Sequence, residues 1–509
     1  MPVTIKLARE EESVSNRLVN PSNDQVPPLT RFLWSLTAFA TGIISNFAQL
    51  VNQIYINALH YDPNMVSVAK SLPMFSGFVT GPMIGHLCDN TRTGWGRRKP
   101  WMLGGLLISA IAGLLLWHVP QSDGKWHWPM FIFIASMFLL LGNIGGAAFG
   151  TASTAMAFEM STDYNERTHL FKWASYTGAV AGFVGPWLLP MCLWFEGSRA
   201  QVERGSRGVV YVAVIMTALI LATGLPAIIF CREKVADHFG EKQVPLISAI
   251  RMTLNNRPFG LLVTSNFVMR FAMNVTGFFF FYLLIYYVGK GDQKLGMTSR
   301  AVMYNSMSVA SLLATAPLAN LTNRIGKKSA LLLSLLISAF AYASLAITFT
   351  TSPGAYVRLA LPWKLAGGAI TFQWPCLLSA VLIGAFTNTM PMIQSSMLAD
   401  VCDLDELNFG HRREGFYSSV FGVCETVAVA VAVAMTGVLL SASGFNSYLA
   451  MQPHRTLMIW LAAVVISQPV GFLLSIMSIL FYPLTRERML EIRAELDLRK
   501  ETARAAPPN

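Results

Sequence analysis

Charged residues are scarce in this chain. Of its 509 residues, only 13% are charged and 53% are hydrophobic, whereas a soluble domain carries about 25% charged residues. The mean hydropathy is +0.48. A soluble fold would have to bury this apolar surface in one core, and cores stop growing at about 250–300 residues. The composition therefore predicts a polytopic membrane protein and excludes disordered, fibrous and secreted disulfide-rich proteins.

Cysteine patterns and catalytic motifs are missing as well. The six cysteines are scattered without any CxxC spacing, which argues against a disulfide framework and against a metal site. There is no Walker loop, no HExxH and no GxSxG sequence. No loop is long enough for a nucleotide-binding domain, and residues 1–31 lack the apolar stretch of a signal peptide. We expect neither an enzyme nor an ATP-driven pump, and no cofactor other than a coupling ion.

Long apolar runs dominate what is present. A membrane-spanning helix needs about 20 apolar residues, and twelve such runs can be placed, so we expect an all-α polytopic protein. The fourth, seventh and eleventh runs are the longest and are expected to tilt or break. The runs lie near 32–59, 64–87, 101–120, 128–157, 170–195, 208–231, 258–289, 298–321, 329–350, 374–399, 415–442 and 456–482.

Lysine and arginine concentrate in the loops on the side of both termini. Cytoplasmic loops carry such an excess, which accounts for the net charge of +11 without a nucleic-acid partner. We expect a multi-pass protein of the plasma (inner) membrane with both termini in the cytoplasm. The expected units are a tail (1–31), a six-helix bundle (32–231), a cytoplasmic linker (232–257), a second six-helix bundle (258–484) and a tail (485–509). The charged stretch 486–505 also has apolar positions typical of a short amphipathic helix on the inner membrane surface.

The two halves of the chain resemble each other. The segment GPMIGHLCDNTRTGWGRRKPW (81–101) matches APLANLTNRIGKKSAL (316–331) in its proline, polar loop, glycine and basic cluster. In a second pair of loops, Glu159 and Asp400 stand 241 positions apart. Loops that recur at half the chain length indicate duplicated bundles around a central site, as in alternating-access transporters. This organisation also argues against a channel.

Three loops carry a family resemblance over the full length of the chain. DNTRTGWGRRKPW (89–101), STDYNERTHL (161–170) and MLADVCDLDELNFGHRREG (397–415) resemble the signatures of the glycoside–pentoside–hexuronide:cation symporters, the melibiose permease group of the major facilitator superfamily. The resemblance implies a fold of twelve transmembrane helices in two pseudo-symmetric six-helix bundles. It also implies secondary transport, typically of a sugar together with a cation.

The charged residues of these loops are candidates for a cytoplasmic gate. Charge-assisted pairs between the loops can form in one state and break in another. Alternatively, the cations only follow the positive-inside rule and contact lipid phosphates; for Lys327 and Arg413 both interpretations remain open. The residues predicted to gate are Asp89, Arg92, Arg97, Arg98, Asp163, Arg167, Asp400 and Arg413.

The carboxylates that bind the cation in related symporters are missing here. Alignment on the loop motifs places glycine or threonine at the corresponding positions, Thr41, Gly77, Gly81 and Gly150. Because a hard cation such as sodium needs oxygen ligands, usually with carboxylate charge, we expect the usual sodium coupling to be lost.

One carboxylate remains within the spans. Of the 27 acidic residues, Glu425 alone lies inside an apolar run, where an isolated charge costs about 2.5 kcal/mol or more. We interpret it as the coupling site for a proton, or else as a neutral acid or the partner of a buried base. Arg270, deep in the seventh run, either pairs with Glu425 or donates to an anionic or hydroxylated substrate. Lys70 lies near a helix end and can reach outward.

Amide and aromatic side chains in the spans suit a sugar, whose ring stacks and whose hydroxyls need partners. The alternative for the amides is hydrogen bonding between helices, and for the aromatic run packing or lipid contact. The predicted substrate-binding residues are Asn46, Gln49, Gln53, Arg270, Asn274, Tyr282, Asn388 and Gln394.

These observations predict a monomeric secondary active transporter that moves a sugar or glycoside by alternating access, coupled to protons. The alternatives are an uncoupled facilitator, a carrier of an organic anion or lysophospholipid, and a receptor that binds sugar without moving it.

Overall fold

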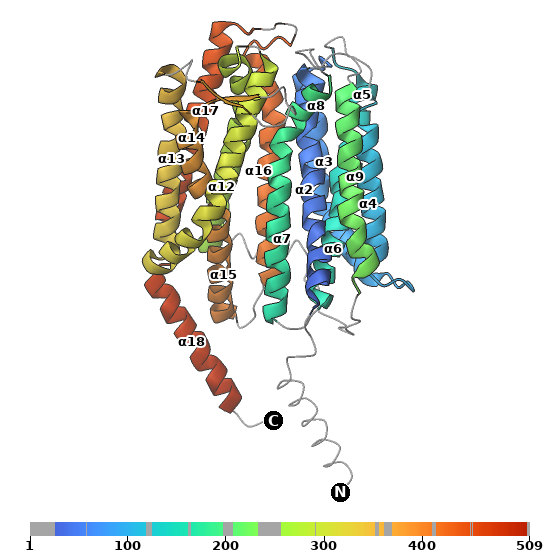
Figure 1. The fold of residues 1–509 in the computed structure, drawn as a ribbon. Coiled ribbons are helices and arrows are strands. Elements are labelled where there is room, and N and C mark those ends of the chain that lie inside the picture. Colours follow the sequence, from blue (N-terminus) through green and yellow to red (C-terminus); the bar gives the residue numbers. More distant parts are fainter. Residues whose placement is uncertain are drawn as a thin grey trace.

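The computed structural model describes residues 26–505, apart from 58, 119–124, 161–163, 197–206, 233–255, 291, 352–355, 361–368, 410–413, 448 and 450. Long helices stand side by side in one bundle (Figure 1). We call the end of the bundle at which α3 ends and α4 begins the lower end, as it is drawn in Figure 1, and the opposite end the upper end.

The first half of the chain is entirely helical where it is described. Two long helices contain irregular turns: a π-helical stretch, η2, interrupts the fourth predicted run, and a 3₁₀ turn, η3, interrupts the fifth. The elements are α2 (Pro28–Asn57), α3 (Pro63–Asn90), α4 (Lys99–Leu115), α5 (Trp128–Phe138), η2 (Leu139–Gly146), α6 (Ala147–Met160), α7 (Tyr164–Val184), η3 (Gly185–Trp187), α8 (Leu188–Glu196) and α9 (Arg207–Phe230).

The second half adds a short β-hairpin to its helices. Strands β1 (Tyr356–Ala360) and β2 (Ala369–Gln373) pair antiparallel at the upper end. The helical elements are α11 (Arg257–Leu283), η4 (Leu284–Val288), α12 (Gln293–Ile325), α13 (Lys327–Thr351), α14 (Cys376–Thr387), α15 (Met390–Phe409), α16 (Glu414–Ala442), α17 (His454–Leu480) and α18 (Arg486–Ala505).

Local sequence signals set several helix ends. Asp62 caps α3 by accepting from the backbone N–H of Met65, and Asn256 caps α11 by accepting from that of Phe259, as N-cap residues do. A proline follows each cap within the first turn, where its missing N–H costs nothing. Gly326 has a φ of +86°, which allows α12 to end and α13 to begin directly after it.

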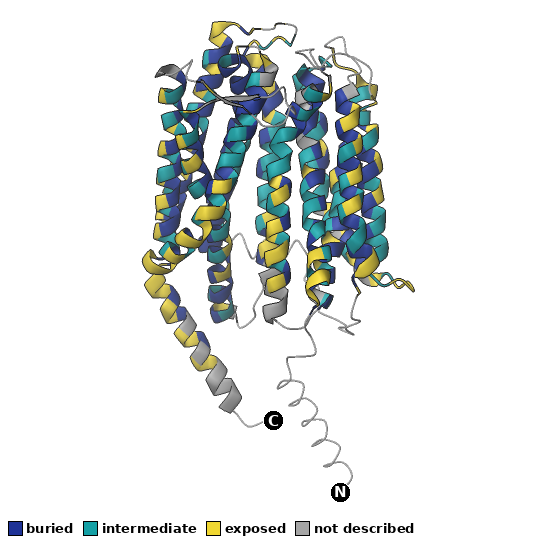
Figure 2. Ribbon diagram, in the orientation of Figure 1, coloured by how far each residue is buried: buried dark blue, intermediate teal, exposed yellow. Residues whose placement is uncertain are grey.

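All twelve predicted apolar runs are helical in the described part of the chain. Among the described residues, seven helices are long and apolar enough to cross a membrane; that all twelve runs cross it stays a prediction. Exposed positions occur along the helices (Figure 2), and many of them are large apolar residues, among them Leu313, Phe340 and Leu378. Apolar faces of this kind suit contact with lipid rather than water. The seven helices that are long and apolar enough to cross a membrane, among the residues described, are Trp128–Ala157, Gly208–Phe230, Arg257–Val288, Lys327–Phe349, Cys376–Asn408, Val420–Ala442 and His454–Leu480.

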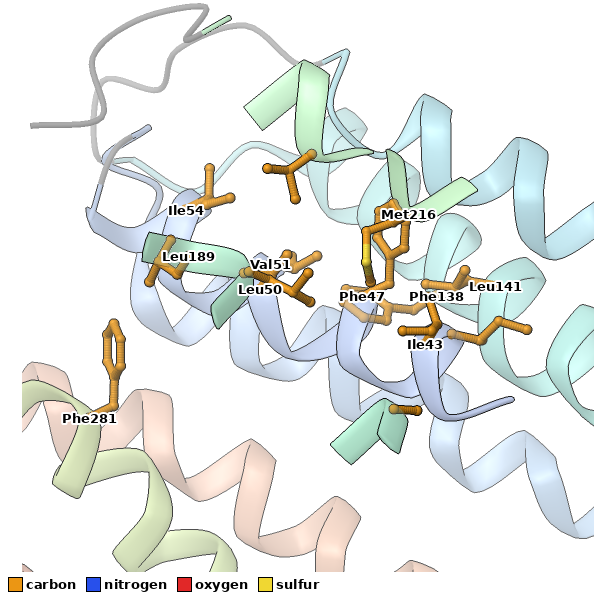
Figure 3. Packing of buried hydrophobic residues seen from close by; sticks show 14 of the residues in the cluster. Ile43, Phe47, Leu50, Val51, Ile54, Phe138, Leu141, Leu189, Met216 and Phe281 are labelled. Carbon is orange, nitrogen blue, oxygen red and sulfur yellow. The ribbon is translucent and has the colours of Figure 1, made fainter. Parts of the chain in front are cut away.

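The interior is closely packed. Figure 3 shows Phe47 and Leu50 of α2 beside Met216 of α9, and the space that these residues line is too narrow for a water molecule. Within the first half, α2 packs on α7 and α9; within the second half, α11 packs on α16 and α17. A substrate therefore does not fit between α2 and α9 at this point.

The two halves meet at the upper end of the bundle. There α3 packs on α16, and α12 packs on η3 and α8. The approach of α3 and α16 is close, because a Cβ atom added at Gly437 would lie 2.5 Å from the carbonyl oxygen of Pro63. One turn further along α16, Ser441 accepts a hydrogen bond of 3.0 Å from the Asn64 amide. The upper ends of the halves are therefore closed against each other.

Helix α18 extends below the lower end of the bundle (Figure 1) and packs on α15. Its Met489, Ile492 and Leu496 are buried in a cluster with residues of α15, and Arg499 donates to the carbonyl of Leu407 at 2.7 Å. At its start, a bond from its own backbone N–H and one from the Thr485 hydroxyl hold the pKa of Glu487 below its usual range. The helix was predicted, but its contact with α15 was not.

Candidate functional site

Arg270 and Glu425 form an ion pair near the middle of two adjacent helices. Nη2 of Arg270, on α11, lies 2.8 Å from Oε1 of Glu425, on α16. The side chains are 24% and 33% exposed, so the pair is accessible although both helices are apolar. An unpaired charge at this depth would cost about 2.5–3.5 kcal/mol. Of the two roles considered for Arg270, pairing with Glu425 is the one seen in this structure.

The ion pair uses only part of the guanidinium. The structure gives one contact between the two groups, and Nε of Arg270 is buried without a hydrogen-bond partner. One turn along α11, Asn274 donates its amide to the backbone carbonyl of Arg270 at 2.9 Å. This region therefore combines a carboxylate, an amide and a guanidinium with an unused donor.

The predicted amide face of α2 is only partly described. Asn46 donates to the carbonyl of Ala181 at 2.9 Å and so joins α2 to α7. A Cβ atom at Gly185 would lie 2.5 Å from Oδ1 of Asn46, so this side chain is enclosed by the neighbouring helix. It makes the interhelical bond that was considered as its alternative role. The side chains of Gln49 and Gln53 lie outside the described residues.

Three other predicted substrate residues have different surroundings. Tyr282 is buried among the rings of Tyr286, Phe445 and Trp460. Gln394 is buried with neither amide atom hydrogen-bonded, and Asn388 is exposed at the break between α14 and α15. Of the predicted set, the structure thus brings together Arg270 and Asn274 with Glu425.

At the lower end of the first half, Glu159 holds two arginines. Its Oε1 lies 2.5 Å from Nη2 of Arg97 and 3.0 Å from Nε of Arg98. Arg98 and Glu159 are only 10% and 11% exposed, and Arg98 also contacts the Cys88 sulfur at 3.3 Å. The network joins the start of α4 to the end of α6. The two arginines were predicted to take part in the gate, whereas Glu159 was noted only as one half of a repeat.

The second half contains the corresponding pair. Nζ of Lys327, the first residue of α13, lies 2.7 Å from Oδ1 of Asp400 on α15 and donates to the carbonyl of Ser396 at 2.9 Å. Lys327 is therefore paired, which favours a structural or gating role over lipid contact alone. Asp400 is 5% exposed, so the contact with Lys327 helps to stabilise its charge.

A further network at the lower end was not predicted. The hydroxyl of Tyr417 donates to Asp405 at 2.9 Å and accepts from the Asn256 amide at 3.0 Å. It joins α15, α16 and the start of α11. Neither Tyr417 nor Asn256 belongs to a recognisable motif, so the acidic run that contains Asp405 was the only signal.

For the other predicted gating residues, the structure gives no ion pair among the described side chains. Arg92 is exposed in the loop before α4. Asp163 and Arg413, together with the side chains of Asp89 and Arg167, lie outside the described residues.

Two of the four aligned positions of the missing carboxylates lie next to open space. A Cβ atom at Gly81 or Gly150 would meet no atom within 4 Å. The hydroxyl of Thr41 donates to the carbonyl of Thr37 at 2.9 Å and is occupied within its own helix. Where side chains are described, no cluster of three or more His, Cys, Asp or Glu residues suits a metal ion.

The comparison with known proteins identifies the family. The model of the family described as MFS/sugar transport protein matches residues 33–486. The chain belongs to this family. It is the glycoside–pentoside–hexuronide:cation symporter branch of the major facilitator superfamily that the loop motifs predicted, and its members are transporters rather than enzymes.

Relatives support this membership at low identity. An uncharacterized symporter of Synechocystis is 24% identical over 83% of this chain and 88% of its own. An isoprimeverose transporter of Lactiplantibacillus pentosus is 22% identical over 90% and 89%. A sphingosine-1-phosphate transporter of Xenopus tropicalis, MFSD2B, is 19% identical over 99% and 98%.

Solved structures support the fold. A bacterial homologue of the human lysosomal transporter Spinster, in an inward-facing and unoccupied conformation, has a TM-score of 0.62 at 14% identity and covers 93% of this chain and 99% of its own. The nucleoside transporter NupG has a TM-score of 0.57 at 12% identity and covers 89% and 100%. The predictions of a helical membrane transporter with the major facilitator fold are confirmed.

Proposed function

We propose that the protein is a secondary active transporter that moves a sugar or glycoside by alternating access and couples this movement to protons through Glu425. The observation that carries the proposal is the Arg270–Glu425 ion pair in the membrane-embedded part of the bundle. Protonation of Glu425 would break the pair and release Arg270. Charged groups within membrane spans usually mark ion or substrate pathways.

The proposed architecture has twelve spans in two six-helix bundles, at 32–231 and 258–484, joined by the linker 232–257. The helical state of all twelve runs supports this division. So does the equivalence of the Arg98–Glu159 and Lys327–Asp400 pairs. The lower end, at which α2 begins and α18 lies, faces the cytoplasm of the plasma membrane, and a monomer suffices. The closed upper end then corresponds to an inward-facing state.

A proton suits the chain better than sodium. Hard cations take several oxygen ligands, and the positions that align with the family's carboxylates are glycine and threonine. Gly81 and Gly150 border open space in place of side-chain oxygens. A single carboxylate can still bind a proton. If Glu425 is merely the structural partner of Arg270, the protein is an uncoupled facilitator.

A lysophospholipid is the second candidate substrate. The relative MFSD2B, named as a sphingosine-1-phosphate transporter, aligns over 99% of this chain. Arg270 would then contact the phosphate, and the apolar helix faces would accommodate the tail.

Uptake into proteoliposomes tests the proposal. A panel of glycosides and a lysophospholipid is offered with and without an imposed proton gradient, and the contents are read by mass spectrometry. We expect a glycoside to accumulate only with the gradient, and Glu425→Gln to abolish the accumulation while equilibration persists. Glu491→Gln, which removes an exposed carboxylate on α18, is the matched control. Unchanged accumulation by Glu425→Gln would exclude this coupling site.

A further inference from the structure

We propose that Arg270 is the binding site for an oxyanion on the transported sugar, and that Glu425 occupies this site until it is protonated. The inference rests on the proposed function and specifies its substrate class: a sugar that carries a carboxylate or a phosphate, in preference to a neutral glycoside. It starts from the incomplete contact between the two side chains.

The geometry leaves half of one guanidinium edge unused. Nε and Nη2 lie on the same edge of the planar guanidinium, and a carboxylate or phosphate that meets this edge can accept from both. Glu425 contacts Nη2 at 2.8 Å, while Nε is buried and has no partner. A ligand oxyanion could therefore make two charge-assisted hydrogen bonds where Glu425 makes a single ion-pair contact. Such a ligand can replace Glu425, whereas a neutral hydroxyl competes poorly with a carboxylate.

Charge balance favours the same substrate class. With Glu425 ionised, the pair is neutral overall. When Glu425 binds a proton, Arg270 remains as an unpaired cation at a depth where charge is costly. A bound oxyanion restores neutrality, so the loaded site (one proton and one anion) has the same net charge as the empty one. A neutral glycoside would leave Arg270 unpaired in the loaded state.

Other titratable groups on the helices around Glu425 have partners of their own. Helices α3, α11 and α15 pack on α16, and Arg270 is the group of α11 that contacts Glu425. Among the described side chains of the other two helices, the charged and histidine groups and their contacts are Lys70 at the Phe138 ring, His86 at Asn90, Asp400 at Lys327, Asp405 at Tyr417, and Asp403 and Glu406, each with an interaction of its own. The thiols of Cys88 and Cys402 are buried, and the side chain of Asp89 lies outside the described residues. The pH dependence of binding should therefore follow Glu425.

The unused Nε donor of Arg270 and the partial exposure of the ion pair would allow a ligand oxyanion to replace Glu425 at Arg270. Both side chains are partly exposed, at 24% and 33%. Asn274 lies one turn from Arg270, where its carbonyl oxygen can accept from a sugar hydroxyl next to the oxyanion; its NH₂ group is already committed to the backbone of Arg270. Asn274 thus supplies an acceptor for a ring hydroxyl, and the guanidinium of Arg270 supplies two parallel N–H donors for the oxyanion.

A matched set of sugars tests the inference. Methyl glucoside, methyl glucuronide and glucose 6-phosphate share a ring and differ in charge, and their uptake is measured in proteoliposomes from pH 5.5 to 8. For a charged sugar we expect KM to rise up to about tenfold for each pH unit while Glu425 is ionised, because one proton is bound with each substrate. Methyl glucoside should be taken up at least tenfold less efficiently. The two charged sugars separate a carboxylate site from a phosphate site.

Two variants distinguish exchange from a structural ion pair. Glu425→Gln should bind the charged sugar with a KM that no longer depends on pH and should lose accumulation. Arg270→Lys keeps the positive charge but lacks the two parallel N–H donors of the guanidinium. KM for the charged sugar should therefore rise about tenfold or more, while its pH dependence persists. For a variant that reconstitutes poorly, a binding measurement replaces uptake. The binding of glucuronate is measured by calorimetry at two pH values, on detergent-purified protein that elutes as one species.

The outcomes separate this inference from the proposed function. Equal uptake of the neutral and charged sugars, or an unchanged pH dependence in Glu425→Gln, would overturn the inference and leave sugar transport standing. If none of a wide glycoside panel enters, the proposed function itself fails. A charged sugar that binds at low pH in wild type and at all pH values in Glu425→Gln would establish the exchange.

Discussion

The ammonium nitrogen of Lys327 lies 2.7 Å from the Asp400 carboxylate, and Arg98 lies 3.0 Å from Glu159 in the corresponding position of the first half. The two acids stand 241 positions apart in the sequence. Each acid contacts a cation at the start of an earlier helix of its own half, α4 for Glu159 and α13 for Asp400. The sequence repeat is therefore also a repeat of contacts. Each pair joins two helices of the same half of the chain. In this conformation the pairs fix the lower end of each half rather than bridging the two halves.

Loss of Glu159 should therefore be more damaging than loss of Asp400. Glu159→Gln leaves two arginines, one of them about 10% exposed, and removal of one partner of a buried pair costs about 3–5 kcal/mol. Asp400→Asn leaves Lys327, which is 28% exposed and can be hydrated, so we expect a cost nearer to 1–2 kcal/mol. Thermal unfolding of the purified variants in detergent measures both.

The control is Glu495→Gln, which removes an exposed acid from a salt bridge on α18 and should leave the melting temperature within error. If Asp400→Asn lowers the melting temperature as much as Glu159→Gln does, the exposure of the remaining cation does not determine the cost.

A side chain at Gly437 should prevent closure of the upper end. The Cβ of Gly437→Leu would lie 2.5 Å from the Pro63 carbonyl oxygen and 2.7 Å from the Ser67 hydroxyl, so α3 and α16 must separate. We expect the variant to shift toward the state that is open at this end and to lose most of its transport. Labelling of Asn64→Cys by a membrane-impermeant maleimide should accelerate several-fold, because Asn64 lies in this contact.

Gly260→Leu serves as the matched substitution, since a Cβ atom there meets nothing within 4 Å. Equal labelling rates with leucine at Gly437 and at Gly260 would argue that the upper contact does not hold the closed state.

A carboxylate at Gly81 should fit and should change the ion dependence. α3 and α16 are antiparallel, and counting down both helices from the contact of Gly437 with Pro63 and Ser67 places Glu425 level with residues 75–79, just above Gly81. The space around Gly81 is open, so Gly81→Asp should fold. We expect uptake at pH 7.5 to become at least threefold faster with sodium, measured against potassium, because a second carboxylate adds hard oxygen ligands.

Gly85→Asp introduces the same charge one turn lower, again with nothing within 4 Å, and should not respond to sodium. A sodium effect in both variants would indicate a surface-charge effect rather than a site.

Much of the fold could be predicted because membrane spans are encoded by composition alone. The breaks were predicted less well. The expected irregularity of the fourth and seventh runs appears as η2 and η4, whereas α16, in the eleventh, is continuous. The breaks at η3 and between α14 and α15 were missed, because membrane helices also tolerate proline without a break, as α9 does at Pro226 and α12 at Pro317.

The site was predictable only where a residue type is costly. Arg270 and Glu425 stood out because charges are rare in spans, and their pairing follows from that cost. Amides and tyrosines carry no such signal: Asn46 bonds to Ala181 and Tyr282 lies in an aromatic cluster. These roles depend on which face of a helix meets its neighbour, and nearly uniform apolar sequences do not record that.

Helix α18 should be held by one face. Ile492 is buried against the lower end of the second half, whereas Leu490 is 62% exposed on the same helix. A charge at Ile492 would be buried without a partner, so Ile492→Asp should release the helix and expose its arginines to trypsin, with cleavage at least tenfold faster in detergent. Leu490→Asp is the matched control and should change the rate little. If Leu490→Asp releases the helix equally, the exposed face also contributes to docking, through a contact that the protein makes only in its surroundings.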